Sequence, residues 1–171
     1  MPELPEVETI RRTLQAKVLN RPIRAIEVHY QRLLQNCTEL ELAQALQSRS
    51  FVELDRRGKY LICCLDSGSR LVLHLRMTGR LVAAPNGCPL EKHTSLQIYL
   101  DGDLEVRLAD QRKFATLHLL QEPGYGPIKG LATMGQEPLD SGFTPEYLRE
   151  QFRGRSASIK SVILDQRRIG G

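Results

Sequence analysis

Between residues 50 and 120, short apolar segments alternate with tight-turn signals, and this alternation constrains the fold more than any other feature of the sequence. The turns at residues 66–69 and 101–103 contain the Asp and Gly residues that are typical of hairpins. Short strands joined in this way pair antiparallel, which predicts a β-sandwich or a barrel. The predicted strands cover residues 50–55, 59–65, 70–76, 80–83, 96–100, 104–109 and 116–120.

Helical patterns precede these strands. After Pro5, apolar residues recur at the spacing of an amphipathic helix. Residues 22–29 form one further predicted strand, and residues 38–46 form a short helix that Thr38 caps, with Glu41 completing a capping box. We expect the helices to pack against a two-layer antiparallel β-sandwich, which gives an α+β fold. The apolar positions of the first helix are Val7, Ile10, Leu14 and Val18.

The composition changes after the last predicted strand. Residues 122–143 are rich in Gly and Pro, which indicates a linker or hinge. Residues 144–152 and 156–164 then follow a helical pattern. The sequence therefore predicts an N-terminal β-sandwich domain at 1–121, the hinge, and an incomplete helical domain at 144–171 that is too small for a core of its own.

Composition and charge exclude several classes of protein. The chain has 171 residues and a net charge of +4, a mild basicity that permits nucleic-acid binding without arguing for it. No stretch approaches 18 apolar residues, and the acidic N-terminus does not resemble a signal peptide, so we expect a cytoplasmic protein. None of the four cysteines belongs to a C-x-x-C pair, so the chain carries no zinc signature and we expect no metal in it.

The opening residues Met1-Pro2-Glu3 carry the strongest chemical signal. Removal of Met1 would leave Pro2 as a secondary amine beside the Glu3 carboxylate, at the start of a helix whose field disfavours the protonated amine. A terminal amine has a pKa of about 7.7–8.0, so a useful fraction is neutral. Such a nitrogen attacks a sugar C1′ or a carbonyl to form an iminium. Taken alone, the same segment is also explained as a frayed terminus.

Six short motifs follow one another along the chain, namely PELPEVET, RRGKY, LHLRMTG, DQRKF, MGQEPL and IKSVILDQ. In this order the chain resembles formamidopyrimidine-DNA glycosylase, a family of bifunctional base-excision repair enzymes that remove 8-oxoguanine and ring-opened purines. Leu4 favours this branch over the related endonuclease VIII branch. The resemblance implies a β-sandwich, a hinge and a helix–two-turn–helix domain, with damaged double-stranded DNA in the cleft of a monomer.

The resemblance also implies catalytic roles. Pro2 is the expected nucleophile, and its iminium allows strand scission by β,δ-elimination. Glu3 is the expected general acid that protonates the sugar ring oxygen. Glu6 matches a further acidic position near the nucleophile, although a first-turn helix acid explains it equally well. Lys59, in the RRGKY motif, matches a strand lysine that grips phosphate beside the lesion and assists elimination.

A further set of residues matches the family's DNA contacts. Met77 resembles an apolar plug for the space that the flipped nucleotide leaves, and Arg112 and Phe114 resemble its partners. Without the motifs, core packing would explain Met77 and Phe114. His74 and His93 match contacts to phosphate or braces of the cleft, with a structural role as the alternative. Lys160 matches a phosphate contact from the helical domain.

The chain departs from the family pattern in two places. It has DQRKFA where relatives have DPRRFG, so Gln111 and Ala115 differ whereas Arg112 and Phe114 are kept. It also ends at Gly171, where relatives continue into a zinc finger with one structural Zn²⁺. We therefore expect a truncated product of a longer bacterial enzyme, nucleoid-associated when on DNA, with no cofactor of its own and with impaired activity because phosphate contacts are lost.

Two alternatives to a glycosylase and lyase for oxidised purines stay open at this stage. The first is a damaged-DNA-binding fragment without turnover, and the second is a relative of the plant and cyanobacterial type with a different lesion preference. Tight, lesion-selective binding without covalent trapping would favour the first. Excision of hydantoins in preference to 8-oxoguanine would favour the second.

Overall fold

The computed structural model describes residues 2–171, which divide into two compact units at the junction of Pro123 and Gly124. The first unit contains all the β-strands and the second contains three short helices. Within the described residues, no helix is long and apolar enough to cross a membrane.

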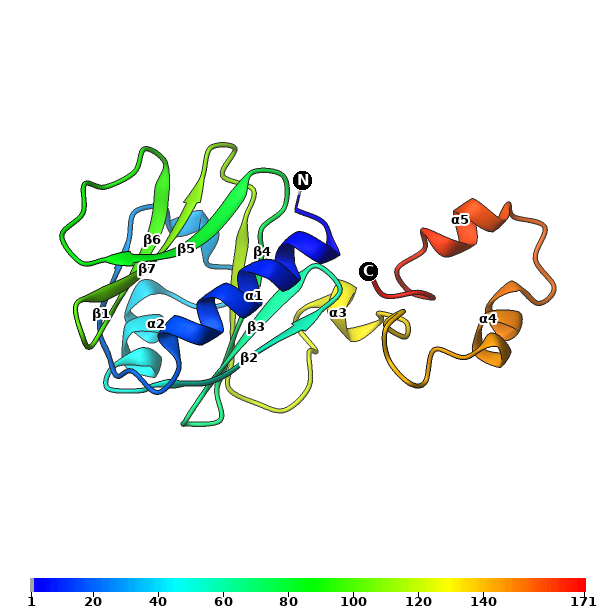
Figure 1. The fold of residues 1–171 in the computed structure, drawn as a ribbon, viewed down its shortest axis with the longest axis horizontal. Helices are drawn as coiled ribbons and strands as arrows, with labels where there is room; N and C mark the ends of the chain where they lie inside the picture. Colours follow the sequence, from blue (N-terminus) through cyan, green and yellow to red (C-terminus); the bar gives the residue numbers. More distant parts are fainter. Residues whose placement is uncertain (1) are drawn as a thin grey trace. The chain divides into compact units, whose positions relative to one another are not determined.

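The first unit is a sandwich of two four-stranded antiparallel sheets (Figure 1). One sheet has the strand order β1-β6-β7-β5 and the other has the order β2-β3-β4-β8. The predicted two-layer antiparallel sandwich is confirmed, and the barrel alternative is wrong. The strands are β1 Ile23–Val28, β2 Phe51–Arg57, β3 Tyr60–Leu65, β4 Arg70–His74, β5 Gly79–Pro85, β6 Thr94–Leu100, β7 Leu104–Asp110 and β8 Thr116–Leu120.

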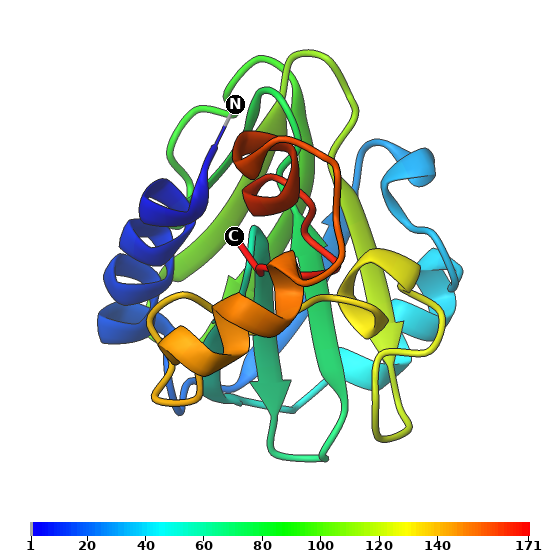
Figure 2. The same cartoon turned by 90° about the vertical axis from the view of Figure 1, so that its right-hand side faces the viewer.

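Helices cover both open sides of the sandwich. Helix α1, Leu4–Val18, packs along the edge strands β2 and β5. On the opposite side, α2, Glu39–Leu46, packs on edge strand β1, and the 3₁₀-helix η1, Gln31–Leu33, packs on edge strand β8. Figure 2 shows α1 and α2 on the two sides of the sheets. Each of the four edge strands thus has a helix or a 3₁₀-helix packed against it.

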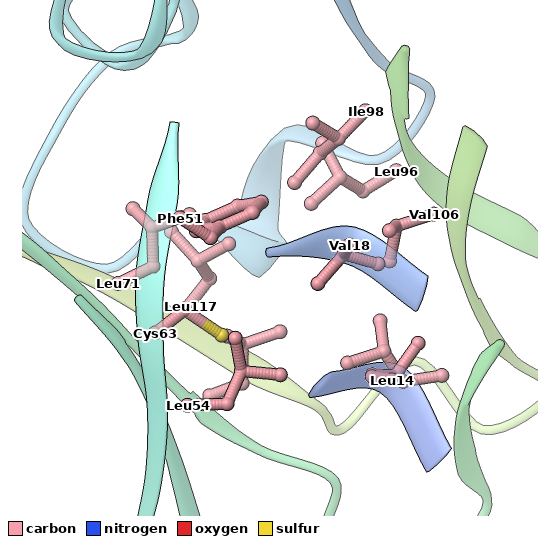
Figure 3. Close-up of a pocket in the computed structure, with 12 residues that line it drawn as sticks. Leu14, Val18, Phe51, Leu54, Cys63, Leu71, Leu96, Ile98, Val106 and Leu117 are labelled. Carbon is pink, nitrogen blue, oxygen red and sulfur yellow. The ribbon is translucent and has the colours of Figure 1, made fainter. Parts of the chain in front are cut away.

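The core lies between the two sheets and beneath α1. Leu14 and Val18 point inward from α1 toward Phe51 and Leu71 of one sheet and Ile98 of the other (Figure 3). The void that these side chains enclose holds only about 20 Å³ and its walls are apolar. Because a void of this size and lining stays dry and admits no ligand, it is a packing feature of the core.

Capping sets where the helices begin. The helix predicted to start directly after Glu3 begins at Leu4, because Glu3 adopts the N-cap conformation and the Glu6 Oε2 accepts from the Glu3 N–H at 3.0 Å. The capping box predicted for α2 is confirmed, since the Thr38 hydroxyl and the Glu41 carboxylate each accept from the other's backbone N–H.

A buried ion pair braces the outer face of the first sheet. Glu105 and Arg107 are 0% and 3% exposed and contact each other, and the Gln97 amide donates to Glu105 at 2.6 Å. Arg107 also donates to the carbonyls of Cys88 and Pro89, at 2.6 and 2.8 Å. These bonds hold the loop between β5 and β6 against the sheet, and the extra acceptors offset part of the cost of burying the charges.

The second unit includes most of the segment that the sequence suggested as a hinge. Ile128, Leu131 and Met134 of that segment are buried, as are Val162 of the last helix and Ile169. The Tyr147 hydroxyl accepts from the Gln136 N–H at 3.0 Å and donates to a carbonyl near the C-terminus. The core of this unit is thus built on the segment 122–143 as much as on the helices. The helices are α3 Lys129–Ala132, α4 Pro145–Phe152 and α5 Ile159–Ile163.

Candidate functional site

Strand register gathers most of the predicted site residues at one end of the sandwich. Across the second sheet, Tyr60 pairs with His74 and His74 pairs with Thr116. Across the first sheet, Gly79 pairs with Asp110. The turn from β4 to β5 and the turn from β7 to β8 connect these paired ends. Residues widely separated in sequence, from the β2–β3 turn to the start of β8, therefore share one end of the fold.

Pro2, Glu3 and Lys59 lie together at this end. The Lys59 Nζ is 3.0 Å from the Glu3 Oε2, and the two side chains are 13% and 49% exposed. Pro2 is half-buried and directly precedes the N-cap residue of α1. The expected removal of Met1 concerns a residue outside the described part of the chain.

Glu6 has a definite structural task in the first turn of α1. Its Oε2 accepts the Glu3 N–H at 3.0 Å, so this carboxylate fixes the backbone that carries Pro2. The side chain is exposed and lies at the positive end of the helix dipole. Glu6 is therefore a first-turn helix acid that also holds the segment beside Pro2, and the two interpretations that the sequence left open do not exclude each other.

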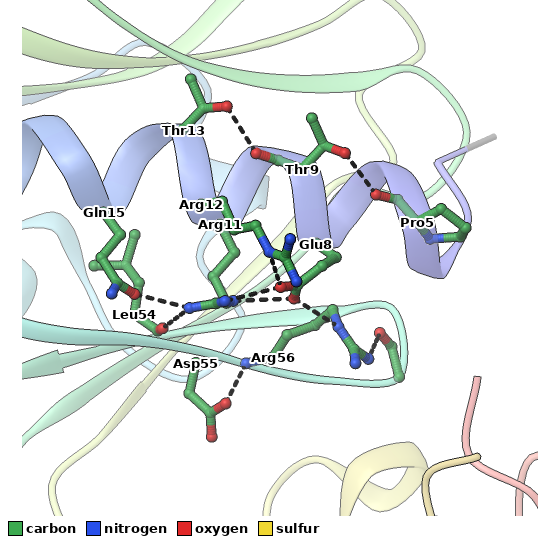
Figure 4. A network of polar contacts seen from close by, with 11 residues as sticks. Pro5, Glu8, Thr9, Arg11, Arg12, Thr13, Gln15, Leu54, Asp55 and Arg56 are labelled. Atoms are coloured by element: carbon green, nitrogen blue, oxygen red, sulfur yellow. Dashed lines mark hydrogen bonds and ion pairs between the residues drawn. The ribbon is translucent and has the colours of Figure 1, made fainter. Parts of the chain in front are cut away.

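Glu8 braces the β2–β3 turn against α1 (Figure 4). Its carboxylate contacts the Arg11 Nη2 at 2.8 Å, the Arg12 Nε at 2.7 Å and the Arg56 Nε at 3.2 Å. The hydrogen bond from Arg11, with those from Arg12 and Arg56, lowers the Glu8 pKa to about 2 against the opposing effect of burial. Arg56 also donates to the Gly58 carbonyl at 2.9 Å. This brace holds the β2–β3 turn, which carries Lys59.

Sequence reasoning did not single out the Glu8–Arg56 contact. The i,i+3 and i,i+4 spacing of Glu8 to Arg11 and Arg12 predicts ion pairs along α1. It gives no sign of Arg56, which is 48 positions away.

His74 is a neutral hydrogen-bond donor at the end of β4. Its ring meets Tyr60 edge-on, with centroids 4.6 Å apart, and its Nδ1 accepts the Arg76 N–H at 3.0 Å. Because Nδ1 accepts, the proton of the neutral ring resides on Nε2. Burial, followed by the positive charges of Arg76 and Lys59, lowers the His74 pKa to about 4. The ring can therefore donate to an anion at neutral pH without being charged.

Met77 and Phe114 project into solvent and do not pack in the core. They are 40% and 51% exposed, and the Arg112 guanidinium lies 4.8 Å from the centroid of the Phe114 ring. Met77 occupies the tight turn before β5, where Arg76 has a positive φ of 56°. Gly79 closes this turn, because a Cβ there would lie 2.9 Å from the Leu75 Cα. Exposed apolar side chains on turns held this firmly are suited to pushing between stacked bases.

His93 and Lys160 are both exposed. His93 precedes β6 with a φ of 67°, and its carbonyl accepts the Asp110 N–H at 3.0 Å. Lys160 lies on α5 in the second unit. Across residues 2–171, no group of three or more His, Cys, Asp or Glu side chains is arranged to hold a metal ion.

The sequence is similar to known DNA repair proteins. Residues 1–117 match the family described as formamidopyrimidine-DNA glycosylase N-terminal domain. Over its whole length the chain is 44% identical to the formamidopyrimidine-DNA glycosylase of Symbiobacterium thermophilum and covers 56% of that protein. It is 39% identical to that of Pelotomaculum thermopropionicum and covers 62% of it. The chain thus spans about three-fifths of the length of these curated relatives.

Solved structures of similar fold contain damaged DNA. The complex of Lactococcus lactis Fpg with DNA containing an abasic site matches with a TM-score of 0.90 and 34% identity, over 99% of this chain and 63% of that chain. The complex of wild-type Lactococcus lactis Fpg (MutM) with DNA containing N7-benzyl-Fapy-dG matches with a TM-score of 0.90 and 35% identity, over 99% of this chain and 62% of that chain.

Proposed function

This chain belongs to the formamidopyrimidine-DNA glycosylase family, and on that premise we propose that it carries the catalytic centre of a base-excision repair DNA glycosylase and abasic-site lyase. The substrate is double-stranded DNA with an oxidised purine such as 8-oxoguanine or a formamidopyrimidine. The observation that carries the proposal is the contact of Lys59 with Glu3 at 3.0 Å, beside the residue that becomes a terminal secondary amine.

The chemistry begins with the neutral amine of Pro2. Its lone pair attacks C1′ of the damaged nucleotide, and the bond from C1′ to the base breaks with the electron pair leaving on the base. Glu3 takes up the proton that the Pro2 nitrogen loses after the attack and delivers it to the sugar ring oxygen as the C1′–O4′ bond breaks, which leaves an iminium between Pro2 and C1′; the departing base takes a proton from water. The iminium acidifies the C2′ proton, and loss of that proton expels the 3′-phosphate by β-elimination. The product is a conjugated iminium, and loss of its C4′ proton expels the 5′-phosphate by δ-elimination.

The surrounding residues support this reaction in the proposal. The Lys59 amine orients the Glu3 carboxylate and offers a positive charge to the phosphate beside the lesion. His74 donates its Nε2–H to a second phosphate oxygen, and His93 and Lys160 supply further phosphate contacts. Met77, with Arg112 and Phe114, fills the space left by the flipped nucleotide, which offsets part of the few kcal/mol lost in unstacking.

Borohydride trapping on an abasic oligonucleotide tests the proposal. The reductant converts the iminium into a stable amine, so the 171-residue chain should form a covalent adduct with DNA. Peptide mapping of this adduct should locate the DNA on Pro2, after intact-mass measurement has verified that Met1 is removed. Absence of an adduct from a chain with a free Pro2, or an adduct on Lys59, would contradict the mechanism.

Two substitutions separate the roles of the residues. Pro2→Gly replaces the secondary amine with a primary amine and should weaken trapping. Lys59→Ala should slow strand elimination more than it slows trapping, because the nucleophile is kept. Lys17→Ala removes an exposed lysine from the far end of α1 and is the matched control, which should behave as the unaltered chain does.

The same experiment distinguishes the alternative function. Lesion-selective DNA binding without any adduct would indicate a binding fragment without turnover. Parallel measurements of excision from hydantoin, 8-oxoguanine and formamidopyrimidine substrates rank the lesions.

We expect the enzyme to act in the bacterial cytoplasm. The structural Zn²⁺ expected in longer relatives would not be held by the residues of this chain.

A further inference from the structure

The turn that carries Met77 and the loop that carries Arg112 and Phe114 are joined by a single buried carboxylate. Asp110, the last residue of β7, is 1% exposed. One of its oxygens, Oδ1, accepts from the Thr78 hydroxyl and from the Arg112 N–H, the latter at 3.1 Å. The Thr78 hydroxyl oxygen also accepts the Arg112 N–H at 3.1 Å. Thr78 directly follows Met77, so the two bonds of its hydroxyl cross from one loop to the other.

The second oxygen of Asp110 organises its own loop. Oδ2 accepts the N–H groups of Phe114 and Ala115, both at 2.7 Å. The Asp110 carbonyl accepts the Lys113 N–H at 3.3 Å, and Lys113 has a φ of 57°, a left-handed conformation that a residue with a side chain adopts at a cost. The carboxylate therefore stabilises a strained loop whose tip presents Phe114.

The electrostatics agree with this geometry. Burial by itself raises the Asp110 pKa, but the hydrogen bonds from Thr78, Ala115, Arg112 and Phe114 together lower it. Asp110 is thus an ionised buried carboxylate whose charge is satisfied entirely by donors from the two loops. Bonds of this charge-assisted kind are among the stronger ones in proteins.

We propose that Thr78 and Asp110 are positioning residues that lock the Met77 turn to the Arg112–Phe114 loop, so that both enter the DNA as one preorganised wedge. This inference rests on the proposed function. If the two loops moved independently, they would have to be ordered when DNA binds. The entropy lost in that ordering would reduce the binding free energy that is left to unstack the bases. The sequence motifs identify the side chains that touch DNA, whereas this latch determines how those side chains are held relative to one another.

The variant Thr78→Val tests the latch directly. Valine keeps the shape of threonine but removes the hydroxyl, so it breaks both bonds between the loops and leaves the bonds from Phe114 and Ala115 to Asp110. Thr78→Ser restores a hydroxyl and should restore the function. Thr13→Val is the matched control, because its hydroxyl bonds only the Thr9 carbonyl within α1. Thermal unfolding of each variant verifies that the chain is folded.

Two measurements report whether the wedge opens duplex DNA as one preorganised unit. In the first, 2-aminopurine is placed beside a tetrahydrofuran site in a duplex, and its fluorescence rises when the neighbouring bases unstack. Thr78→Val should lower that rise by at least about twofold at saturating protein. In the second, borohydride trapping is compared on duplex and single-stranded abasic DNA. The ratio of the duplex rate to the single-strand rate should fall about tenfold, because only the duplex has to be opened.

The outcomes separate the inference from the function on which it rests. If Thr78→Val matches the unaltered chain in both measurements, or if Thr78→Ser fails as valine does, the latch is refuted and the proposed function stands. Equal losses on duplex and single-stranded DNA would also refute it, because the defect would then lie in the chemistry. If the unaltered chain gives neither an adduct nor a fluorescence change, the proposed function fails and the inference fails with it.

Discussion

Replacing Glu8 with glutamine removes the charge that braces the β2–β3 turn against α1. The contacts with Arg11, Arg12 and Arg56 lower the Glu8 pKa from 4.5 to about 2. A shift of that size corresponds to about 3 kcal/mol at 1.36 kcal/mol per pKa unit. The Glu8 side chain is 23% exposed, and glutamine keeps one accepting oxygen. We therefore expect Glu8→Gln to lower the free energy of unfolding by about 2 kcal/mol at pH 7.

The pH dependence of this loss is its signature. Because the Glu8 pKa is lower in the folded chain than in the unfolded chain, the stabilisation is complete above about pH 4.5 and disappears as the pH falls toward 2. The free energies of unfolding of Glu8→Gln and the unaltered chain should therefore converge over that range.

Urea denaturation followed by circular dichroism measures both free energies, which suits a chain without tryptophan. Glu122→Gln changes an exposed carboxylate at the end of the same unit and is the control, with no expected loss of stability. A difference between Glu8→Gln and the unaltered chain that stays constant from pH 7 down to pH 3 would refute the reasoning.

Three further outcomes are expected. The imidazole of His74 should titrate near pH 4 by NMR, and a His74 pKa near 6.5 would contradict this expectation. Because the folded chain binds this proton less readily than the unfolded chain, the free energy of unfolding should fall as the pH drops from 6.5 to 4, and His74→Gln should flatten that dependence. Gly79→Ala should lower the free energy of unfolding by about 1–3 kcal/mol in urea titrations, because the Cβ of the alanine would collide with the Leu75 backbone. An unchanged urea midpoint would show that the turn relaxes to make room for the Cβ. Alkylation at pH 8 followed by mass spectrometry should modify exposed Cys88 first and spare Cys63, because burial raises the Cys63 pKa to about 12. Early alkylation of Cys63 would mean that this part of the core opens.

The sequence predicted the elements of the first unit closely because their signals are local. Alternating apolar residues and hairpin turns are enough to indicate strands, and the Thr38 cap is enough to begin α2. The two short helices η1 and α3 escaped prediction, since three or four residues give no periodicity. The segment that contains α3 was expected as a hinge from its Gly and Pro content, which stays a prediction, and Leu131 within it is fully buried. Composition does not reveal that an irregular segment has a core to pack against.

The candidate residues follow the same division. Motifs in the sequence named Pro2, Glu3 and Lys59, because each lies in a short run whose order matches a family. They did not give the 3.0 Å contact between Lys59 and Glu3, which joins residues 56 positions apart. Asp110 stands in a recognised motif but was not singled out, because its importance lies in accepting bonds from both loops.

By itself the sequence therefore determined the kinds of element, their order and the identities of the chemical groups, since each depends on neighbours within one turn of helix or one hairpin. Only the tertiary structure decided which groups meet. Strand register brings the turns to one end of the sandwich, and two buried or half-buried carboxylates then fix them there. Glu8 holds the β2–β3 turn through Arg56, and Asp110 holds the loops that carry Met77 and Phe114. Such long-range pairing depends on how the whole core packs, and local sequence does not encode it.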